Sequence, residues 1–423
     1  MKRFTVSLLA LTLVLSLTAC TPASDKPTTS ATPTPTPTTS ESLIPTTPSP
    51  TPEVEDPAIT AKRAEALAEA DKLTLGYYYD EALALLSDPT IANDEVTAKT
   101  AEIQAVVDSL VPYTGTVKHI FFHSLIVYPE RIFRDKTTPM GGYNAGFSTK
   151  AEFEKMLPQL YERGYVLYDL NECFEKIDGK MVRKEILLPP GKEPLVLSVD
   201  DVAYQYGSAY ALKLVLKEDG SIVNLVKNDA GELVEMADGD VYGVLERFLQ
   251  DHPDFSYRGH RGTFAMTGFQ GAFGYDIDVP EGQQKVLELS TALRQNGWNF
   301  ASHSYTHNRK GYFGPGTEAG KIQWDTNRWV NEIEPYLGDT NLFIAPYGFL
   351  LKQPYLQIVL DAGFDIYCTV DDEFINETYD DYALMSRIEI GGYSMSHFQD
   401  LLNENFFNVD EVFDAAGRPP VIG

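Results

Sequence analysis

Two adjacent aspartates, Asp200 and Asp201, end an apolar run at residues 195–199. Such a run predicts a buried strand, and carboxylates placed at its end are costly to desolvate unless they have a function. Neighbouring residues on an extended chain point in opposite directions, so one carboxylate could bind a cation while the other accepts a proton. Taken alone, the pair is better explained as two solvated aspartates in a loop.

Two of the seven histidines, His303 and His307, follow another apolar run, at residues 298–301, and lie four residues apart. This spacing predicts both imidazoles on one face of a helix that begins there. Two neutral imidazoles and a carboxylate form a three-ligand site with an open position for water, which is the arrangement of a catalytic zinc site. The pair alone does not establish such a site.

Alternating apolar runs and amphipathic stretches, from about residue 117 onward, must position these side chains. Helical patterns include one that begins at Thr149, where Glu152 completes a capping box, and another that follows Pro354. The alternation predicts a parallel sheet, and the length favours an α/β barrel, in which catalytic groups lie at the C-terminal ends of the strands. Strands are predicted at 117–122, 194–199, 263–266, 298–301, 342–345 and 366–370.

Four segments, in chain order, resemble the motifs of the polysaccharide deacetylases of carbohydrate esterase family four, the NodB homology domain. They are Ser-Val-Asp-Asp at 198–201, Gly-Thr-Phe-Ala at 262–265, Ser-His-Ser-Tyr-Thr-His at 302–307 and Phe-Ile-Ala-Pro-Tyr-Gly at 343–348. The resemblance covers about residues 117–390. It implies a distorted (β/α) barrel and a divalent metal, for which zinc is the first expectation and cobalt, manganese or nickel are alternatives.

The same resemblance implies roles for single residues. Asp200 becomes the general base, and Tyr347 offers its backbone N–H to the oxyanion formed at the acetyl carbon. The metal ligands become Asp201, His303 and His307.

The chain departs from the family pattern at several positions. Val199 and Val202 replace the usual Phe and Gly around the aspartates. Ile344 occupies the position of the usual arginine, which orients the catalytic aspartate. Arg387 and Arg261 are the candidates to replace that arginine.

The general acid is expected before the first motif. His123 ends the apolar segment 118–122, which resembles the N-terminal strand of the circularly permuted branch of the family, the branch that includes exopolysaccharide deacetylases. A histidine at the edge of the core is the other interpretation of His123, and His397 is the alternative acid. The remaining histidines, expected at the surface or in packing, are His119, His252 and His260.

The stretch between the first and the histidine motif is longer than the family core needs, which predicts an insertion at about 204–255. Turn signals between short alternating runs predict a small β excursion there, followed by a helix. Tyr204, Tyr206 and Tyr210 either stack on sugar rings or pack the insertion.

The first twenty residues have the pattern of a lipoprotein signal peptide. Lys2 and Arg3 precede an apolar run that is too short to span a membrane and ends in Leu-Thr-Ala-Cys, which resembles a bacterial lipobox with Cys20 as the lipidated residue. This predicts a lipid-anchored protein at the extracellular face of the cell membrane. An ordinary signal peptide ending by chance in a cysteine would leave the protein freely secreted.

Three further regions follow the signal peptide. Residues 21–57 are rich in Thr and Pro, which predicts a disordered linker that acts as a spacer. Residues 58–112 carry apolar residues at spacings of three and four, which predicts a small helical bundle. Residues 113–423 hold the deacetylase-like domain.

The composition limits the partners. The 423 residues include 34 Lys and Arg against 61 Asp and Glu, a net charge of −27, which argues against nucleic acid and against electrostatic attraction to anionic membranes. Three cysteines exclude a disulfide scaffold, although Cys173 and Cys368 could pair outside the cell.

Together these features predict a hydrolase of linear amides that removes N-acetyl groups from a polysaccharide containing N-acetylglucosamine. Peptidoglycan and a secreted exopolysaccharide are both suitable substrates, and the protein is expected to act as a monomer. An O-acetyl esterase of the acetylxylan type and a non-catalytic glycan-binding lipoprotein are the alternatives.

Overall fold

A computed structural model describes residues 55–423 of the chain. The predicted signal peptide, its Cys20 and the linker up to residue 54 lie outside the described residues. Within residues 55–423, no helix is both long and apolar enough to cross a membrane.

Three helices come first: α1 (Pro57–Leu75), α2 (Tyr79–Leu86) and α3 (Asp94–Ser109). Side-chain caps begin two of them, because Asp56 accepts a hydrogen bond from the backbone of α1 and Asn93 from the backbone of α3. Small and apolar side chains such as Ala70, Ala82 and Ile103 are buried between the helices. No group with evident site chemistry faces this small core.

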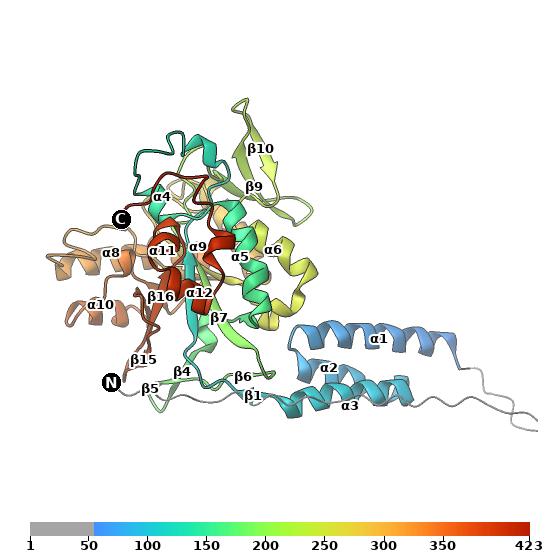
Figure 1. The fold of residues 1–423 in the computed structure, drawn as a ribbon. Helices are drawn as coiled ribbons and strands as arrows, with labels where there is room; N and C mark the ends of the chain where they lie inside the picture. The colour runs from blue at the N-terminus through green and yellow to red at the C-terminus, as the bar shows by residue number, and fades with distance from the viewer. Residues whose placement is uncertain (1–54) are drawn as a thin grey trace, which may run out of the picture. The chain divides into compact units, whose positions relative to one another are not determined.

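Seven parallel strands form a closed barrel, in the order β11-β12-β13-β14-β16-β2-β7, with β7 pairing again with β11 (Figure 1). This confirms the predicted (β/α) barrel. The central strand β7 is buried over nearly its whole length, as expected for a continuous apolar run covered on both faces. The strands are β2 (Lys118–Phe122), β7 (Glu193–Asp200), β11 (Gly262–Met266), β12 (Trp298–Ser302), β13 (Leu342–Ile344), β14 (Ile366–Val370) and β16 (Ala383–Glu389).

The barrel is joined weakly along two seams. Strands β12 and β13 share a single residue pair, Ser302 with Phe343, and β16 and β2 share two. The other neighbours in the ring share three to five pairs. The seams divide the barrel into one arc of β2, β7, β11 and β12 and another of β13, β14 and β16.

Helices lie between most successive strands of the barrel, whereas β14 and β16 are joined through the short strand β15 (Asn376–Thr378) alone (Figure 1). The capping box predicted at Thr149 and Glu152 is present at the start of α5 (Lys150–Glu162). The helix predicted after Pro354 is also present, as α10 (Tyr355–Asp361), and α7 (Pro280–Gln295) and α8 (Ala319–Glu332) are two further helices around the barrel. The smaller elements are β1 (Val111–Pro112), α4 (Tyr143–Gly146), β3 (Tyr165–Leu167), β4 (Phe174–Ile177), β5 (Lys180–Arg183), β6 (Leu187–Leu188), α9 (Glu334–Leu337), β15 (Asn376–Thr378), α11 (Gly392–His397), α12 (Gln399–Asn405) and α13 (Val409–Val412).

A three-stranded antiparallel sheet of β8 (Lys213–Leu216), β9 (Ile222–Lys227) and β10 (Leu233–Met236) follows β7, and α6 (Val241–Asp251) follows the sheet. Of the three tyrosines proposed to stack on sugars, Tyr204 and Tyr210 are buried, so that interpretation is wrong for both and they pack the fold instead. Tyr206 packs between Phe147 and Tyr210.

Cys173 and Cys368 are both buried and unpaired. Each contributes an apolar sulfur to the same part of the core. Burial raises the pKa of both thiols, which keeps them protonated and unreactive.

Candidate active site

The two aspartates at the end of β7 take different environments. Asp200 is the last residue of the strand and is buried, whereas Asp201 is partly exposed. The backbone of Asp201 has a φ of 58°, a left-handed conformation that a non-glycine residue adopts at a cost of about 1–2 kcal/mol. Both carboxylates nevertheless lie near His303, whose Nε2 is 3.7 Å from an Asp200 oxygen and 4.0 Å from an Asp201 oxygen, so the opposite directions predicted for an extended chain are wrong here.

Asp201, His303 and His307 form a cluster with the geometry of a metal site. The Nε2 atoms of His303 and His307 lie 4.0 and 3.9 Å from the two Asp201 carboxylate oxygens. The three ligand atoms lie within 4.8 Å of one another, so one ion placed between them can approach all three residues.

The histidines direct suitable nitrogen atoms toward the cluster. The Nδ1–H of His303 donates to the carbonyl oxygen of Ile344 over 2.7 Å, so Nε2 faces the cluster. Burial, followed by repulsion from His303, lowers the pKa of His307 to about 4, which leaves this imidazole neutral at pH 7. Two neutral imidazoles and one carboxylate suit zinc and also accept cobalt, manganese or nickel.

The helix predicted to carry both histidines is absent. Residues 303–307 form a loop in which Ser304 and His307 have φ values of 60° and 46°, and the next helix begins at Ala319. The imidazoles meet through these left-handed turns, with ring centroids 4.8 Å apart.

Asp325, on α8, holds this loop in place. It is fully buried and accepts hydrogen bonds from the backbone N–H of Tyr305 at 2.7 Å and of Thr306 at 2.9 Å, and from the Thr306 hydroxyl at 2.6 Å. The sequence analysis missed Asp325, because no local pattern connects it with the loop.

Arg387, on β16, makes a two-pronged ion pair with Asp200. Its two terminal nitrogens donate to the two carboxylate oxygens over 2.7 and 3.0 Å, and both side chains are buried. Burial alone would raise the pKa of Asp200, but the charges of Arg387 and His303 outweigh burial and hold this pKa well below its ordinary value. The carboxylate is therefore ionised at neutral pH.

Of the two candidate arginines, the structure thus places Arg387 beside the aspartate. Arg261 instead pairs with Glu246, over 3.0 Å, and does not line the site. Ile344, at the position of the family arginine, is a buried core residue whose carbonyl orients His303.

His123 lies just beyond the end of β2, close to the carboxylate of Glu389. Its Nδ1–H donates to the Gly146 carbonyl over 3.0 Å, and Nδ1 lies 3.6 Å from a Glu389 oxygen. The imidazole stacks on Phe147 with ring centroids 4.8 Å apart. Its Nε2 makes no hydrogen bond within residues 55–423, so this nitrogen is available to a ligand.

Glu389 is a second residue that the sequence analysis missed. It lies two residues after Arg387 on β16, and alternate residues of a strand share one face. Burial raises the pKa of Glu389, and the nearby charge of His123 opposes that rise. Two charged residues at alternate positions of a buried strand are the signal that could have revealed it.

The other histidines lie elsewhere. His397 is exposed and stacks on Tyr393, outside the cavity that His123 lines. His119 is buried, with Nε2 2.9 Å from the Ser198 hydroxyl, which also accepts from Arg387. His252 and His260 do not line the cavity.

Tyr347 has a left-handed backbone and a half-exposed ring. Its φ is 57°, and its hydroxyl donates to the carbonyl of His307 over 3.0 Å while its ring packs 4.5 Å from the His307 ring. The backbone N–H of Tyr347 has no acceptor among the described residues, which leaves it free to bind an oxyanion.

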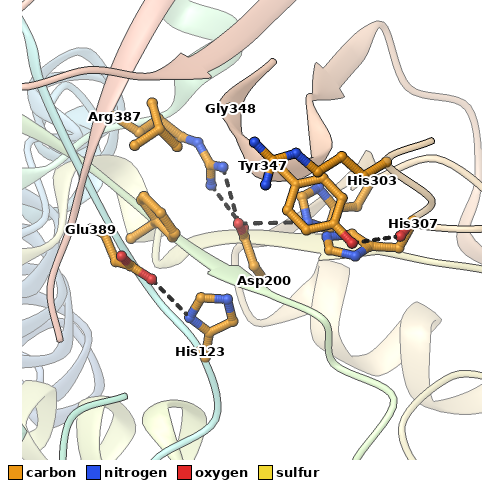
Figure 2. A pocket seen from close by; sticks show the side chains of 11 residues that line it. His123, Asp200, His303, His307, Tyr347, Gly348, Arg387 and Glu389 are labelled. Carbon is orange, nitrogen blue, oxygen red and sulfur yellow. Dashed lines mark hydrogen bonds and ion pairs between the residues drawn. The ribbon is translucent and has the colours of Figure 1, made fainter. Parts of the chain in front are cut away.

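These residues surround one cavity of about 350 Å³ at the C-terminal ends of the strands. Figure 2 shows His123 and Asp200 on one side of it and the two histidines with Tyr347 on the other. The lining residues are Phe121, His123, Asp200, His303, His307, Arg309, Tyr347, Gly348, Val370, Arg387 and Glu389. Fold and site together define a (β/α) barrel with a candidate catalytic metal centre.

Comparison with known proteins finds no matching family model and no matching curated protein. Among solved structures, the deacetylase PplD of Streptococcus pyogenes, in complex with acetate, aligns over 70% of this chain and 100% of its own, at 14% identity and a TM-score of 0.40. A de-N-acetylase from Aggregatibacter actinomycetemcomitans aligns over 68% of this chain and 100% of its own, at 13% identity and a TM-score of 0.41.

IcaB from Ammonifex degensii aligns over 66% of this chain and 93% of its own, at 14% identity and a TM-score of 0.37.

Proposed function

We propose that this chain is a metal-dependent deacetylase that hydrolyses N-acetyl groups of an extracellular or cell-envelope polysaccharide containing N-acetylglucosamine. The observation that carries the proposal is the convergence of three chemically distinct parts on one cavity. These parts are the Asp201, His303 and His307 cluster, the ionised Asp200 and the histidine His123. Hydrolysis of an amide by a metal-activated water molecule uses each of them.

A divalent metal held by Asp201, His303 and His307 would polarise the acetyl carbonyl and acidify a water molecule. Asp200 takes the proton of the attacking water as the new C–O bond forms, because its carboxylate is ionised and buried beside the cluster. Arg387 fixes the orientation of that carboxylate through both oxygens. The free N–H of Tyr347 donates to the oxyanion.

Departure of the amine requires a proton. His123 donates it from Nε2 to the leaving nitrogen as the C–N bond breaks, which gives acetate and a free amino sugar. The Gly146 carbonyl fixes the ring orientation, and the Glu389 carboxylate stabilises the imidazolium.

The decisive experiment measures acetate release. Protein loaded with zinc is expected to release acetate from N-acetylglucosamine oligomers, and dialysis against a chelator should abolish the release until a divalent metal is returned. The absence of acetate from every acetylated glycan at saturating zinc would instead support a glycan-binding protein without catalytic activity.

The same assay separates amide from ester hydrolysis. An O-acetyl esterase is the second candidate, because the base, the metal ligands and the oxyanion donor serve an ester equally well. His123 favours the amide, since an amine is a poor leaving group without a proton whereas an alkoxide needs less assistance. Faster release from acetylated xylan than from N-acetylglucosamine oligomers would contradict the proposal.

The general acid can be identified by comparing two histidine variants. His123→Ala is expected to lower kcat for N-acetyl substrates by roughly 100-fold or more, the contribution of general acid catalysis, without loss of metal binding. The matched variant His397→Ala should keep wild-type kcat, because His397 lies outside the cavity. The reverse pattern would assign the proton donor to His397.

A further inference from the structure

A second cavity, of about 390 Å³, adjoins the catalytic one. The two share Val370 and Glu389 in their walls, so they lie side by side. The remainder of the second cavity comes from the loop after β14 and from β16, α11 and α12. Apart from Glu389, no residue of the second cavity has a role in the proposed reaction.

The floor of the second cavity is apolar and aromatic. Tyr393 and Phe398 meet edge to face with ring centroids 5.7 Å apart, and Phe398 remains 37% exposed. Ile388 and Leu401 complete this surface. Flat rings and aliphatic side chains are suited to the apolar faces of a sugar ring.

The mouth of this cavity is acidic. Asp371 and Asp372 are exposed there, and neither forms an ion pair with Lys or Arg in the part of the chain that the structure describes. The backbone N–H of Asp371 donates to the Arg387 carbonyl over 3.2 Å, which fixes the loop against β16. Two unneutralised carboxylates above an aromatic floor complement a sugar that carries positive charge.

We infer that the second cavity binds a sugar unit with a protonated amine, the neighbour of the acetylated unit in the catalytic cavity. This rests on the proposed deacetylase function, because deacetylation produces that amine. The product of one turnover, after the polymer moves by one unit, would then occupy the second cavity during the next. The preferred substrate is accordingly a partly deacetylated chain.

The test uses a fully deacetylated glucosamine oligomer, which cannot react, and two partly acetylated isomers of equal length. Calorimetry on metal-free protein is expected to detect binding of the unreactive oligomer. The two isomers carry a glucosamine on one or the other side of an acetylated unit. One of them should show a KM roughly three- to ten-fold below that of the fully acetylated oligomer. A change of this size is expected for two exposed charge pairs.

The variant Asp371→Asn/Asp372→Asn keeps the shape and hydrogen-bond acceptors of the loop but removes its charge. It should lose binding of the unreactive oligomer and raise the KM of the favoured isomer to that of the fully acetylated oligomer, with unchanged kcat. Asp94→Asn/Asp108→Asn removes the same charge from the exposed side of α3 and should leave the preference intact.

The outcomes separate this inference from the proposed function. Turnover of the fully acetylated oligomer without preference for either isomer, or a preference that survives in the Asp371→Asn/Asp372→Asn protein, overturns the inference and leaves the deacetylase function standing. Absence of turnover on every oligomer overturns both. Binding that persists undiminished at high salt also overturns it, because the attraction between exposed charges is screened.

Discussion

Replacement of His303 by alanine is expected to abolish metal binding and acetate release together. His303 is buried, and its Nδ1 bond to the Ile344 carbonyl fixes its Nε2 toward Asp201. Alanine removes one of only three protein ligands, and two ligands do not hold a catalytic divalent ion at neutral pH. Metal content after gel filtration and acetate release by the same sample are the two measurements.

His397→Ala is the matched control, since this histidine is exposed and remote from the cluster. It should retain metal and activity. Circular dichroism must show that the His303→Ala protein is folded, because the substitution also leaves a cavity. Activity retained in a folded His303→Ala protein would eliminate the proposed metal centre.

Replacement of Arg387 by glutamine is expected to change both stability and the pH profile. Removing one partner of a buried ion pair costs about 3–5 kcal/mol, because the other charge is left without compensation. Asp200 would be that charge, and loss of its orientation should lower kcat by at least roughly 100-fold. Denaturant unfolding and acetate release measure the two effects.

The sign of the pH effect follows from the pKa of Asp200. In the natural protein this pKa lies below the ordinary value of about 4, so the pair stabilises the fold at neutral pH and the stabilisation is lost only as pH falls through the lowered pKa. Without Arg387, burial raises the pKa above its ordinary value. The loss of stability should then be largest at neutral pH and shrink under acid conditions.

Activity should respond in the same direction. A base must be ionised, so the acidic limb of the pH–rate profile should move to higher pH in the Arg387→Gln protein. The control is Arg261→Gln, which breaks the ion pair with Glu246 away from the site and should leave the acidic limb in place. An unmoved limb in the Arg387→Gln protein would show that Asp200 is not the titrating base.

The apolar runs predicted six barrel strands correctly but missed β16. Runs of four to six mostly apolar residues marked these strands. The sequence of β16 contains Ser386, Arg387 and Glu389. Arg387 pairs with Asp200 and Glu389 with His123, and the Ser386 hydroxyl bonds to the backbone of residues 373 and 375. Such a strand looks like a surface segment until its partners are known.

For the candidate site, the sequence likewise predicted some features correctly and others not. The motifs predicted which residues converge, and His303, His307 and Asp201 do lie together. The predicted helix at the histidines was wrong, because spacing alone does not reveal left-handed turns stabilised by Asp325. Asp325 carries no local sequence signal, because the backbone groups that it binds lie about 20 residues earlier in the chain.

The two weakly paired seams of the barrel have a mechanical consequence. Three contacts of the site bridge them: Arg387 with Asp200 and Glu389 with His123 across one seam, and the Ile344 carbonyl with His303 across the other. Since few backbone pairs join the arcs there, these contacts help to hold the arcs together. A separation of the two arcs would therefore break all three contacts at once and alter the surroundings of Asp200, His123 and His303 together.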